Sequence, residues 1–183
     1  MDRTLVERAQ RGDREAYEAV ARAAAPALYR IAYRIVRDSD RADDAVQQTL
    51  VAIWRELPSL RDVDRFSSWT YRLVVRFCTA ESRRNAKAGV RFIAIDDTAT
   101  GRGDAIGDVA TRDQLERALQ ALSVEHRTVV VLHHYVGLPL GEIAEILGIP
   151  YGTVGSRLHH ATSSLRASLD AGDRSPVAGG QPA

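Results

Sequence analysis

The chain has 183 residues, 45% of them hydrophobic, which is enough to bury the core of one or two small domains. Its single cysteine, Cys78, excludes an internal disulfide, and its formal net charge is only +1. No apolar run is long enough to cross a bilayer, and the N-terminus is charged from its second residue, unlike a secretory signal, so we expect a soluble cytoplasmic protein.

Residues 1–84 are expected to form a bundle of about four helices. Apolar residues recur there at helical spacing, and no stretch alternates as a strand would. The three apolar stripes consist of Ala16, Val20 and Ala23, then Leu28, Ile31, Ala32 and Ile35, then Val46, Leu50, Ile53, Trp54 and Leu57.

The third of these helices is expected to begin at a cap provided by Asp38 or Ser39 and to run to about Leu57. Beside its core stripe it carries an acidic and amide-rich patch. The patch consists of Asp43, Asp44, Gln47 and Gln48. It is either an ordinary solvated helix face or a docking surface for a basic partner helix, and the residues alone leave both readings open.

The next helix, predicted over residues 66–84, is the most basic of the chain. It carries Arg72, Arg76, Arg83 and Arg84 against the single Glu81. Arginines that meet phosphates beside aromatic rings are the chemistry of single-stranded nucleic-acid binding. Aromatic residues at helical spacing are more often core residues, however, so we expect Trp69 and Phe77 to be at least partly buried.

Helical periodicity is lost after residue 84 and returns at residue 112. Residues 85–111 collect Gly and Asp and are predicted to be a flexible, extended linker, and residues 172–183 a disordered tail. Residues 112–171 are predicted to form a second helical domain. The fold class is therefore all-α, with two small helical domains joined by an extended linker.

Residues 140–161 have the pattern of a helix-turn-helix. Pro139 suits the first position of a helix, Gly148 suits a left-handed C-cap, and Pro150 prevents the first helix from continuing. The second helix has an inward stripe of Val154, Leu158, Ala161, Leu165 and Leu169. Gly152, Thr153, Ser156, His159 and His160 are expected to face outward, with Arg157 on the flank.

The second domain is not basic overall. Residues 112–171 contain five Arg and six acidic residues, a net charge of −1. Because phosphate neutralisation supplies most non-specific DNA affinity, this domain alone is expected to bind DNA weakly and in a salt-dependent way. We therefore expect an additional contact, outside this domain, to help hold the domain on DNA.

Four linked segments together resemble the bacterial sigma factors of the small extracytoplasmic-function group. They are DRADDAVQQTLVAIW, SLRDVDRFSSWTYRL, ALQALSVEHRTVVVLHHYV and GLPLGEIAEILGIPYGTVGSRL, in the order of the family's core-binding, promoter-melting and promoter-reading regions. The resemblance covers about residues 5–170. It implies a dissociable subunit of RNA polymerase with no catalytic residue, cofactor or metal of its own.

The resemblance also implies a role for particular residues. Asp43, Asp44, Gln47 and Gln48 would lie on the helix that docks on the largest (β′) polymerase subunit. Arg61, Asp62, Trp69, Arg72, Arg76, Arg83 and Arg84 would open and bind the −10 element, and Tyr151, Thr153, Ser156, Arg157, His159 and His160 would read the −35 element. The implied partners are core RNA polymerase, promoter DNA and an anti-sigma factor, without membrane insertion.

The chain departs from the family pattern at four positions. Gly155 stands where Lys or Arg is usual and His160 where Arg is common, so two permanent positive charges are missing from the −35 helix. Arg76 replaces the usual Asn of the melting helix, and Glu81 stands near an expected Asp. These changes concern promoter specificity more than family membership.

Three other classes of protein fit the sequence less well. A metalloenzyme would need more than the pairs His133/His134 and His159/His160, because adjacent helical residues point about 100° apart and cannot chelate one metal together. A stand-alone regulator that binds DNA as a dimer would need a dimer interface and a sensory domain, and residues 1–84 resemble neither. A degenerate sigma-like interaction module is favoured only by the missing charge at Gly155 and His160.

Overall fold

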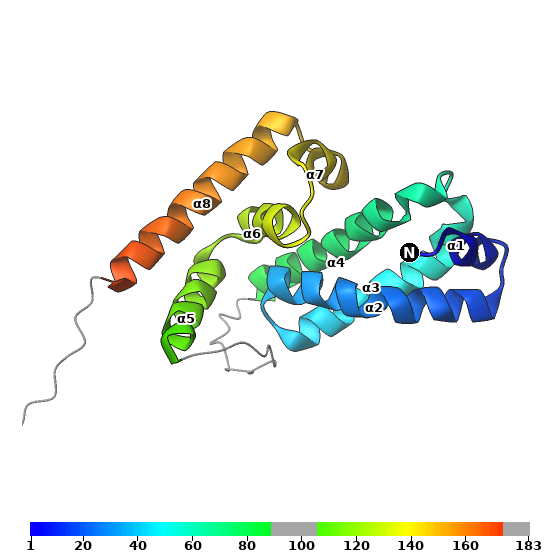
Figure 1. Ribbon diagram of the computed structural model, residues 1–183, viewed down its shortest axis with the longest axis horizontal. Coiled ribbons are helices and arrows are strands. Elements are labelled where there is room, and N and C mark those ends of the chain that lie inside the picture. The colour runs from blue at the N-terminus through cyan, green and yellow to red at the C-terminus, as the bar shows by residue number, and fades with distance from the viewer. Residues whose placement is uncertain (89–105, 174–183) are drawn as a thin grey trace, which may run out of the picture.

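Helices form all the regular secondary structure of residues 1–88 and 106–173, the part of the chain that the computed structural model describes (Figure 1). The N-terminal module consists of α1 (Arg3–Gln10), α2 (Arg14–Val36), α3 (Ser39–Glu56), the 3-10 turns η1 (Leu57–Ser59) and η2 (Val63–Arg65), and α4 (Phe66–Ala88). The C-terminal module consists of α5 (Ile106–Ala121), α6 (Val124–Val130), the π-helical turn η3 (Val131–Tyr135), α7 (Leu140–Leu147) and α8 (Tyr151–Asp173). The predicted all-α fold with two helical modules is confirmed.

Aspartate side chains start the first three helices. The carboxylates of Asp2, Asp13 and Asp38 accept hydrogen bonds from backbone N–H groups two or three residues further on. Such caps satisfy donors that have no partner inside the helix, and each contributes about 1 kcal/mol. Asp38 is therefore the cap of α3, and Ser39 is its first helical residue.

The four α-helices of the N-terminal module enclose an apolar core, as predicted. Its largest fully buried side chains include Leu28, Ile35, Ile53, Leu57 and Val74. Burial of each such side chain contributes roughly 1.5–3 kcal/mol, which makes the packing of these faces the main source of the bundle's stability.

Two residues of the predicted apolar stripes do not belong to this core. Ala23 is exposed, because the four-residue step from Val20 brings Ala24 inward instead. The side chain of Trp54 is 47% exposed and lies with its ring against the edge of Tyr17, at a centroid distance of 4.6 Å. On α3, Ile53 takes the inward position and Trp54 faces the surface.

The helix-turn-helix has the predicted geometry with one difference. Gly148 adopts the left-handed conformation (φ 64°, ψ 36°), and its N–H donates to the carbonyl of Ala144, which closes α7. Pro139 is not the first helical residue but the residue before it, because its ψ of 152° is extended. Val154 and Ala161 are fully buried and fix the face of α8 that turns inward.

The helices reach beyond the predicted domain boundaries. α4 continues to Ala88 and α5 begins at Ile106, so both ends of the predicted linker 85–111 are helical. α8 ends at Asp173, two residues inside the predicted tail 172–183. The rest of both segments lies outside the described residues.

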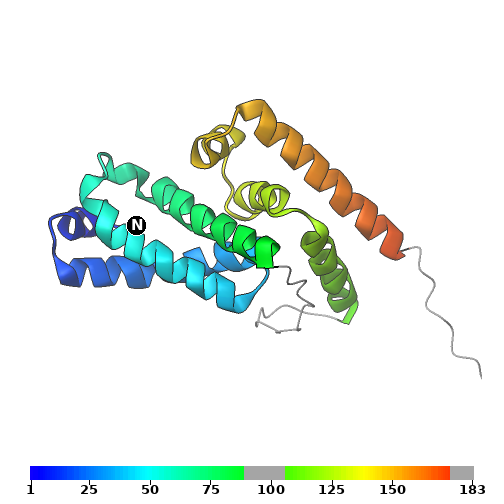
Figure 2. The same ribbon diagram turned by 180° about the vertical axis from the view of Figure 1, so that it is seen from behind.

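The two modules pack against each other, which the sequence did not predict. One continuous cluster of buried residues runs from Val6 in α1 to Val154 in α8 and includes Leu132 and Ile143. Both views show α4 alongside α6 and α7 (Figures 1 and 2). Among the helices of residues 1–88 and 106–173, none combines the length and apolar character needed to span a bilayer.

Candidate nucleic-acid interface

The outward face of α8 presents the polar residues expected of a DNA-reading helix. Tyr151 at its first position is 62% exposed, and Ser156, His159 and His160 are also exposed. Thr153 and Arg157 are partly buried at the flank. The buried stripe on the opposite side anchors the helix, so its polar face is free to approach a groove of DNA.

Gly155 lies within α8 in open surroundings. A Cβ atom added there would meet nothing within 4 Å, and its backbone is not left-handed. We therefore expect Gly155→Ala to raise the free energy of unfolding by about 1 kcal/mol, since Ala loses less backbone entropy in a helix. Urea denaturation followed by circular dichroism measures this change.

Gly148→Ala is the matched control for Gly155→Ala. Its surroundings are equally open, but its φ of +64° is strained for Ala, so we expect a loss of about 1 kcal/mol. Equal effects of the two substitutions would contradict the assignment of Gly155 to an unstrained helix.

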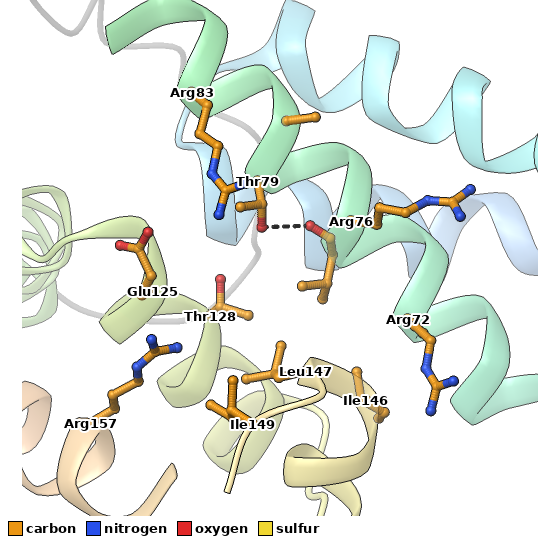
Figure 3. Close-up of a pocket in the computed structure, with 12 residues that line it drawn as sticks. Arg72, Arg76, Thr79, Arg83, Glu125, Thr128, Ile146, Leu147, Ile149 and Arg157 are labelled. Carbon is orange, nitrogen blue, oxygen red and sulfur yellow. Dashed lines mark hydrogen bonds between the residues drawn. The ribbon is translucent and has the colours of Figure 1, made fainter. Parts of the chain in front are cut away.

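Two arginines of the basic helix α4, Arg72 and Arg83, extend toward the C-terminal module, whereas Arg76 extends toward Glu56 of α3. Arg72, Arg76 and Arg83 line a groove of about 550 Å³ between α4 and the helices α6–α8, and Arg157 enters it from α8 (Figure 3). Within this lining the only acidic residue is Glu125. The sequence analysis assigned the three α4 arginines to the −10 set and Arg157 to the −35 set, and the structure places all four at one groove.

The arginines of the groove differ in their partners. Arg72 donates to the backbone carbonyl of Glu145 at 2.8 Å, and Arg76 pairs with Glu56 at 3.3 Å. In Figure 3, Arg83 and Arg157 point into the space between the two modules. Opposite α4, Ile146, Leu147 and Ile149 form the apolar part of the wall, and Glu125, Thr128 and Arg157 form its polar part.

The other predicted −10 residues lie at or near the surface. Arg61, Asp62 and Arg84 are exposed, and Asp62 caps η2. Trp69 is partly buried, with its ring centroid 6.0 Å from that of Phe66. The expectation that Trp69 is at least partly buried is confirmed, and the rest of its surface is accessible to solvent.

The patch on α3 extends further than the sequence indicated. Asp43, Asp44 and Gln47 are exposed, whereas Gln48 is partly buried and donates to Glu81 at 3.1 Å. One turn beyond Gln47, the apolar Val51 is 45% exposed. We refer to the exposed side chains of Asp43, Asp44, Gln47, Val51 and Trp54 as the α3 surface.

A hollow of about 400 Å³ lies beside the α3 surface. It is lined by side chains of α3 and α4, among them Gln47, Val51 and Phe77. The positions of Val51 and Trp54 could have identified them as members of the α3 surface. Both follow Gln47 on the same side of the helix, outside the period of the buried residues.

The most deeply buried charge of the described residues is Arg127 of α6, which the sequence reading missed. Its side chain donates to the carbonyls of Leu119, Gln120 and Leu122 at 2.8–3.1 Å and to that of Ile35 at 2.7 Å. Burial, and secondarily the charge of Arg37, lowers the pKa of Arg127 to about 10. The guanidinium therefore stays charged at neutral pH.

Histidines and the cysteine were the candidates for metal or redox chemistry. His133 contacts the carbonyl of Leu138 through Nδ1 at 2.9 Å, and its ring lies edge-on to that of His134. The rings of His126 and His160 are 6.4 Å apart. In the described part of the chain, no group of three or more His, Cys, Asp or Glu residues is arranged to hold a metal ion.

Cys78 is fully buried in the N-terminal core, and desolvation raises the pKa of its thiol to about 12. Since the thiolate is the reactive form, we expect the native protein to react with a disulfide reagent at least about 100-fold more slowly than the urea-unfolded chain at pH 8. The absorbance of the coloured thiol that the reagent releases on reaction with Cys78 measures this rate. Rapid labelling of the native protein would place Cys78 outside the core.

Comparison with known sequences follows the division into two modules. The family model described as sigma-70 region 2 matches residues 20–88, and the model described as sigma-70, region 4 matches residues 112–165. The ECF RNA polymerase sigma factor SigL of Mycobacterium tuberculosis is 34% identical over 149 residues, which cover 79% of this chain and 84% of SigL.

Two solved structures have a similar fold. One is the sigma factor RpoE in complex with the anti-sigma factor NepR from Bartonella quintana (TM-score 0.69, 23% identity, covering 84% of this chain and 96% of RpoE). The other is CnrH in complex with the cytosolic domain of CnrY (TM-score 0.65, 28% identity, covering 93% of this chain and 97% of CnrH).

Proposed function

Since this chain belongs to the sigma-70 family, in the extracytoplasmic-function (ECF) group of RNA polymerase sigma factors, we propose that its two helical modules divide the recognition of a promoter between them. The protein is a promoter-specificity subunit: its partners are core RNA polymerase and promoter DNA. The proposal assigns residues 1–84 to polymerase binding and the −10 element, and residues 112–171 to the −35 element. We propose that the protein acts in the cytoplasm. The polymerase catalyses RNA synthesis, and this subunit directs it to promoters.

The outward face of α8 is proposed to read the −35 element. The observation that carries this assignment is that the polar residues of α8 are exposed while Val154 and Ala161 hold its opposite face in the core. The residues assigned are Tyr151, Thr153, Ser156, Arg157, His159 and His160. Among them only Arg157 carries a permanent charge. Specificity for the −35 element is therefore proposed to rest on hydrogen bonds and apolar contacts to base edges.

The −10 element is proposed to meet α4 and the turns before it. Arg72, Arg76, Arg83 and Arg84 supply positive charge along one helix, and the half-buried Trp69 offers a ring against which an unpaired base can stack. Arg61 and Asp62 lie in the exposed segment before α4. Flipping a base costs a few kcal/mol, and charge close to a stacking surface offsets that cost.

Core RNA polymerase, through its largest subunit β′, is proposed to bind the α3 surface. Its acidic residues Asp43 and Asp44 suit a basic partner helix, and Gln47 adds hydrogen-bonding capacity. Polymerase binding also explains how a C-terminal module of net charge −1 holds DNA, because joining two weak contacts in one complex raises their effective concentration. An anti-sigma factor is a further proposed partner, by analogy with the complex of RpoE with the anti-sigma factor NepR.

Transcription of fragmented genomic DNA by core polymerase, with and without this protein, tests the proposal when the RNA 5′ ends are mapped. We expect new start sites that share two upstream motifs. Arg72→Ala and Arg157→Ala should each lower these transcripts by about tenfold, the cost of one lost DNA contact. Arg22→Ala, on the exposed side of α2, is the matched control and should leave them unchanged.

Two negative outcomes separate the alternatives. Stable co-purification with polymerase without new start sites would indicate an interaction module that no longer selects promoters. Absence of binding to polymerase, together with binding of a DNA palindrome, would indicate a stand-alone regulator.

A further inference from the structure

The segment between α3 and α4 has little regular structure of its own. Over residues 57–65 it consists of the 3-10 turns η1 and η2, of three residues each. Hydrogen bonds in 3-10 turns have poorer geometry than those of an α-helix, so contacts with neighbouring elements decide how firmly such a segment is held. The segment carries Arg61 and Asp62, which are exposed and are proposed to meet the −10 element. The arrangement of these two residues therefore depends on what holds the segment.

The short helix α1 lies against this segment at one end of the N-terminal module, as both views show (Figures 1 and 2). The side-chain amide of Gln10 donates to the carbonyl of Leu57 at 3.1 Å and to that of Leu60 at 2.7 Å. These two carbonyls lie at the two ends of η1, so one side chain holds both ends of the turn. At η2, Arg3 pairs with the carboxylate of Asp64 at 2.8 Å.

The two contacts from α1 differ in strength. The side chains of Arg3 and Asp64 are 62% and 67% exposed, and an ion pair between exposed side chains contributes little net stability. Gln10 is partly buried, and its helix is fixed in the core by the buried Val6 and Ala9. Loss of a partly buried hydrogen-bond donor leaves its acceptors without a partner, which costs more than loss of an exposed ion pair. Gln10 is therefore the firmer of the two contacts.

We propose that Gln10 is a positioning residue for recognition of the −10 element, which it influences only through the segment that it holds. By fixing the backbone at both ends of η1, it keeps Arg61 and Asp62 in one arrangement toward the DNA. This inference rests on the proposed function of those two residues, and α1 itself contains none of the residues assigned to either promoter element.

The expected consequence is a gain in selectivity. A binding group distinguishes one base from another when neighbouring residues fix its position. Selectivity is a difference of affinities, and a mobile segment reduces that difference because it can adapt to the wrong base. Gln10 is therefore expected to affect the choice of base at the −10 element more than the total amount of transcription.

Hydrogen exchange of the free, full-length protein, followed by mass spectrometry, tests the first step without DNA. Gln10→Met keeps the approximate length and volume of the side chain and removes both donors. We expect the backbone amides of residues 57–65 to exchange about tenfold faster in this variant, and those of the buried helices at an unchanged rate. Arg11→Met is the matched control: Arg11 is exposed and donates to the carbonyl of Glu7 within α1, so its replacement should leave the segment unchanged.

Two further substitutions at the same position make the test specific. Gln10→Lys retains N–H donors at a similar reach and should recover most of the protection. Gln10→Glu has the shape of the wild-type side chain but cannot donate when ionised, so it should exchange as fast as Gln10→Met. It also keeps the proposal testable if Gln10→Met fails to fold, and circular dichroism checks the helices of each variant.

Transcription by core polymerase with the full-length protein tests the second step. A promoter mapped in the genomic assay is randomised at its −10 element, and the RNA made from each template is counted. We expect Gln10→Met to lower the preference for the best base over the worst by about fivefold at one or more −10 positions. Base preferences in a second library, randomised at the −35 element, should not change. A simple loss of folded protein would lower all transcripts alike and leave both sets of preferences intact.

The outcomes for the positioning role and for the proposed function can be told apart. Unchanged exchange of the segment in both Gln10→Met and Gln10→Glu would overturn the proposal at its first step. Faster exchange combined with wild-type preferences at the −10 element would overturn the positioning role. Absence of start sites with the wild-type protein would overturn the proposed function and the positioning role with it, whereas the exchange rates would still show whether Gln10 holds residues 57–65.

Discussion

Replacement of Arg127 by Met is expected to lower the free energy of unfolding by about 3 kcal/mol, a large part of the stability of a small domain. Arg127 is only 6% exposed, and its guanidinium donates to four backbone carbonyls. Met fills a similar volume but donates nothing, so the carbonyls at the end of α5 and the carbonyl of Ile35 lose their partner. A buried acceptor without a partner costs about 1–3 kcal/mol.

Chemical denaturation at pH 7 measures this loss, and Arg117→Met is the matched control. Arg117 is exposed on the neighbouring helix α5, and its replacement should change stability by less than about 0.5 kcal/mol. Arg127→Lys keeps the charge without the planar fork and should recover only a minor part of the loss. A cost for Arg127→Met as small as that of Arg117→Met would show that water replaces the guanidinium at these carbonyls.

The pKa of Arg127 gives this effect a defined pH dependence. Burial lowers the folded-state pKa to about 10, below the ordinary value of an arginine, so the folded protein binds this proton less tightly than the unfolded chain. The contribution of this titration to stability therefore rises with pH, and only above about pH 10. We expect the stability difference between the wild type and Arg127→Met to be constant from pH 6 to 8.

Local sequence signals predicted the helices well. Asp38 before an apolar stripe predicted the start of α3, and Gly148 followed by Pro150 predicted the end of α7. Both signals act within a few residues, through a capping hydrogen bond or an allowed φ angle. The periodicity of α8 likewise predicted which side of the helix is buried.

Contacts between the modules could not be predicted in the same way. Arg127 lies 92 positions from Ile35, whose carbonyl it binds, and nothing in either local sequence indicates the other. Periodicity shows which face of a helix is apolar, but not which surface covers it. An arginine in an apolar stretch of sequence is ordinarily exposed to solvent. The burial of Arg127 depends on the ends of α2 and α5, which pack against it only in the folded structure.

Val51→Asp is expected to weaken binding of core RNA polymerase by about 100-fold. Val51 is 45% exposed on the α3 surface, one turn beyond Gln47 and beside the hollow of about 400 Å³. Val51 lies about two turns beyond Asp43, next to the apolar Trp54 and Phe77 and away from the acidic residues proposed to meet the basic partner helix. A carboxylate placed there would be buried under the partner among apolar groups, and an unpaired interfacial charge costs roughly 2–5 kcal/mol. The isolated protein should keep its stability, because the side chain already faces solvent.

Competition against labelled wild-type protein for core polymerase measures this affinity. Ala167→Asp on the exposed face of α8 introduces the same charge in the other module and should bind as the wild type does. Trp54→Ala should also weaken binding, but it loses its contact with Tyr17 as well, so its stability must be measured in parallel. Wild-type affinity of a folded Val51→Asp variant would move the polymerase interface away from the α3 surface, because no partner that covers this helix face could accommodate the added charge without cost.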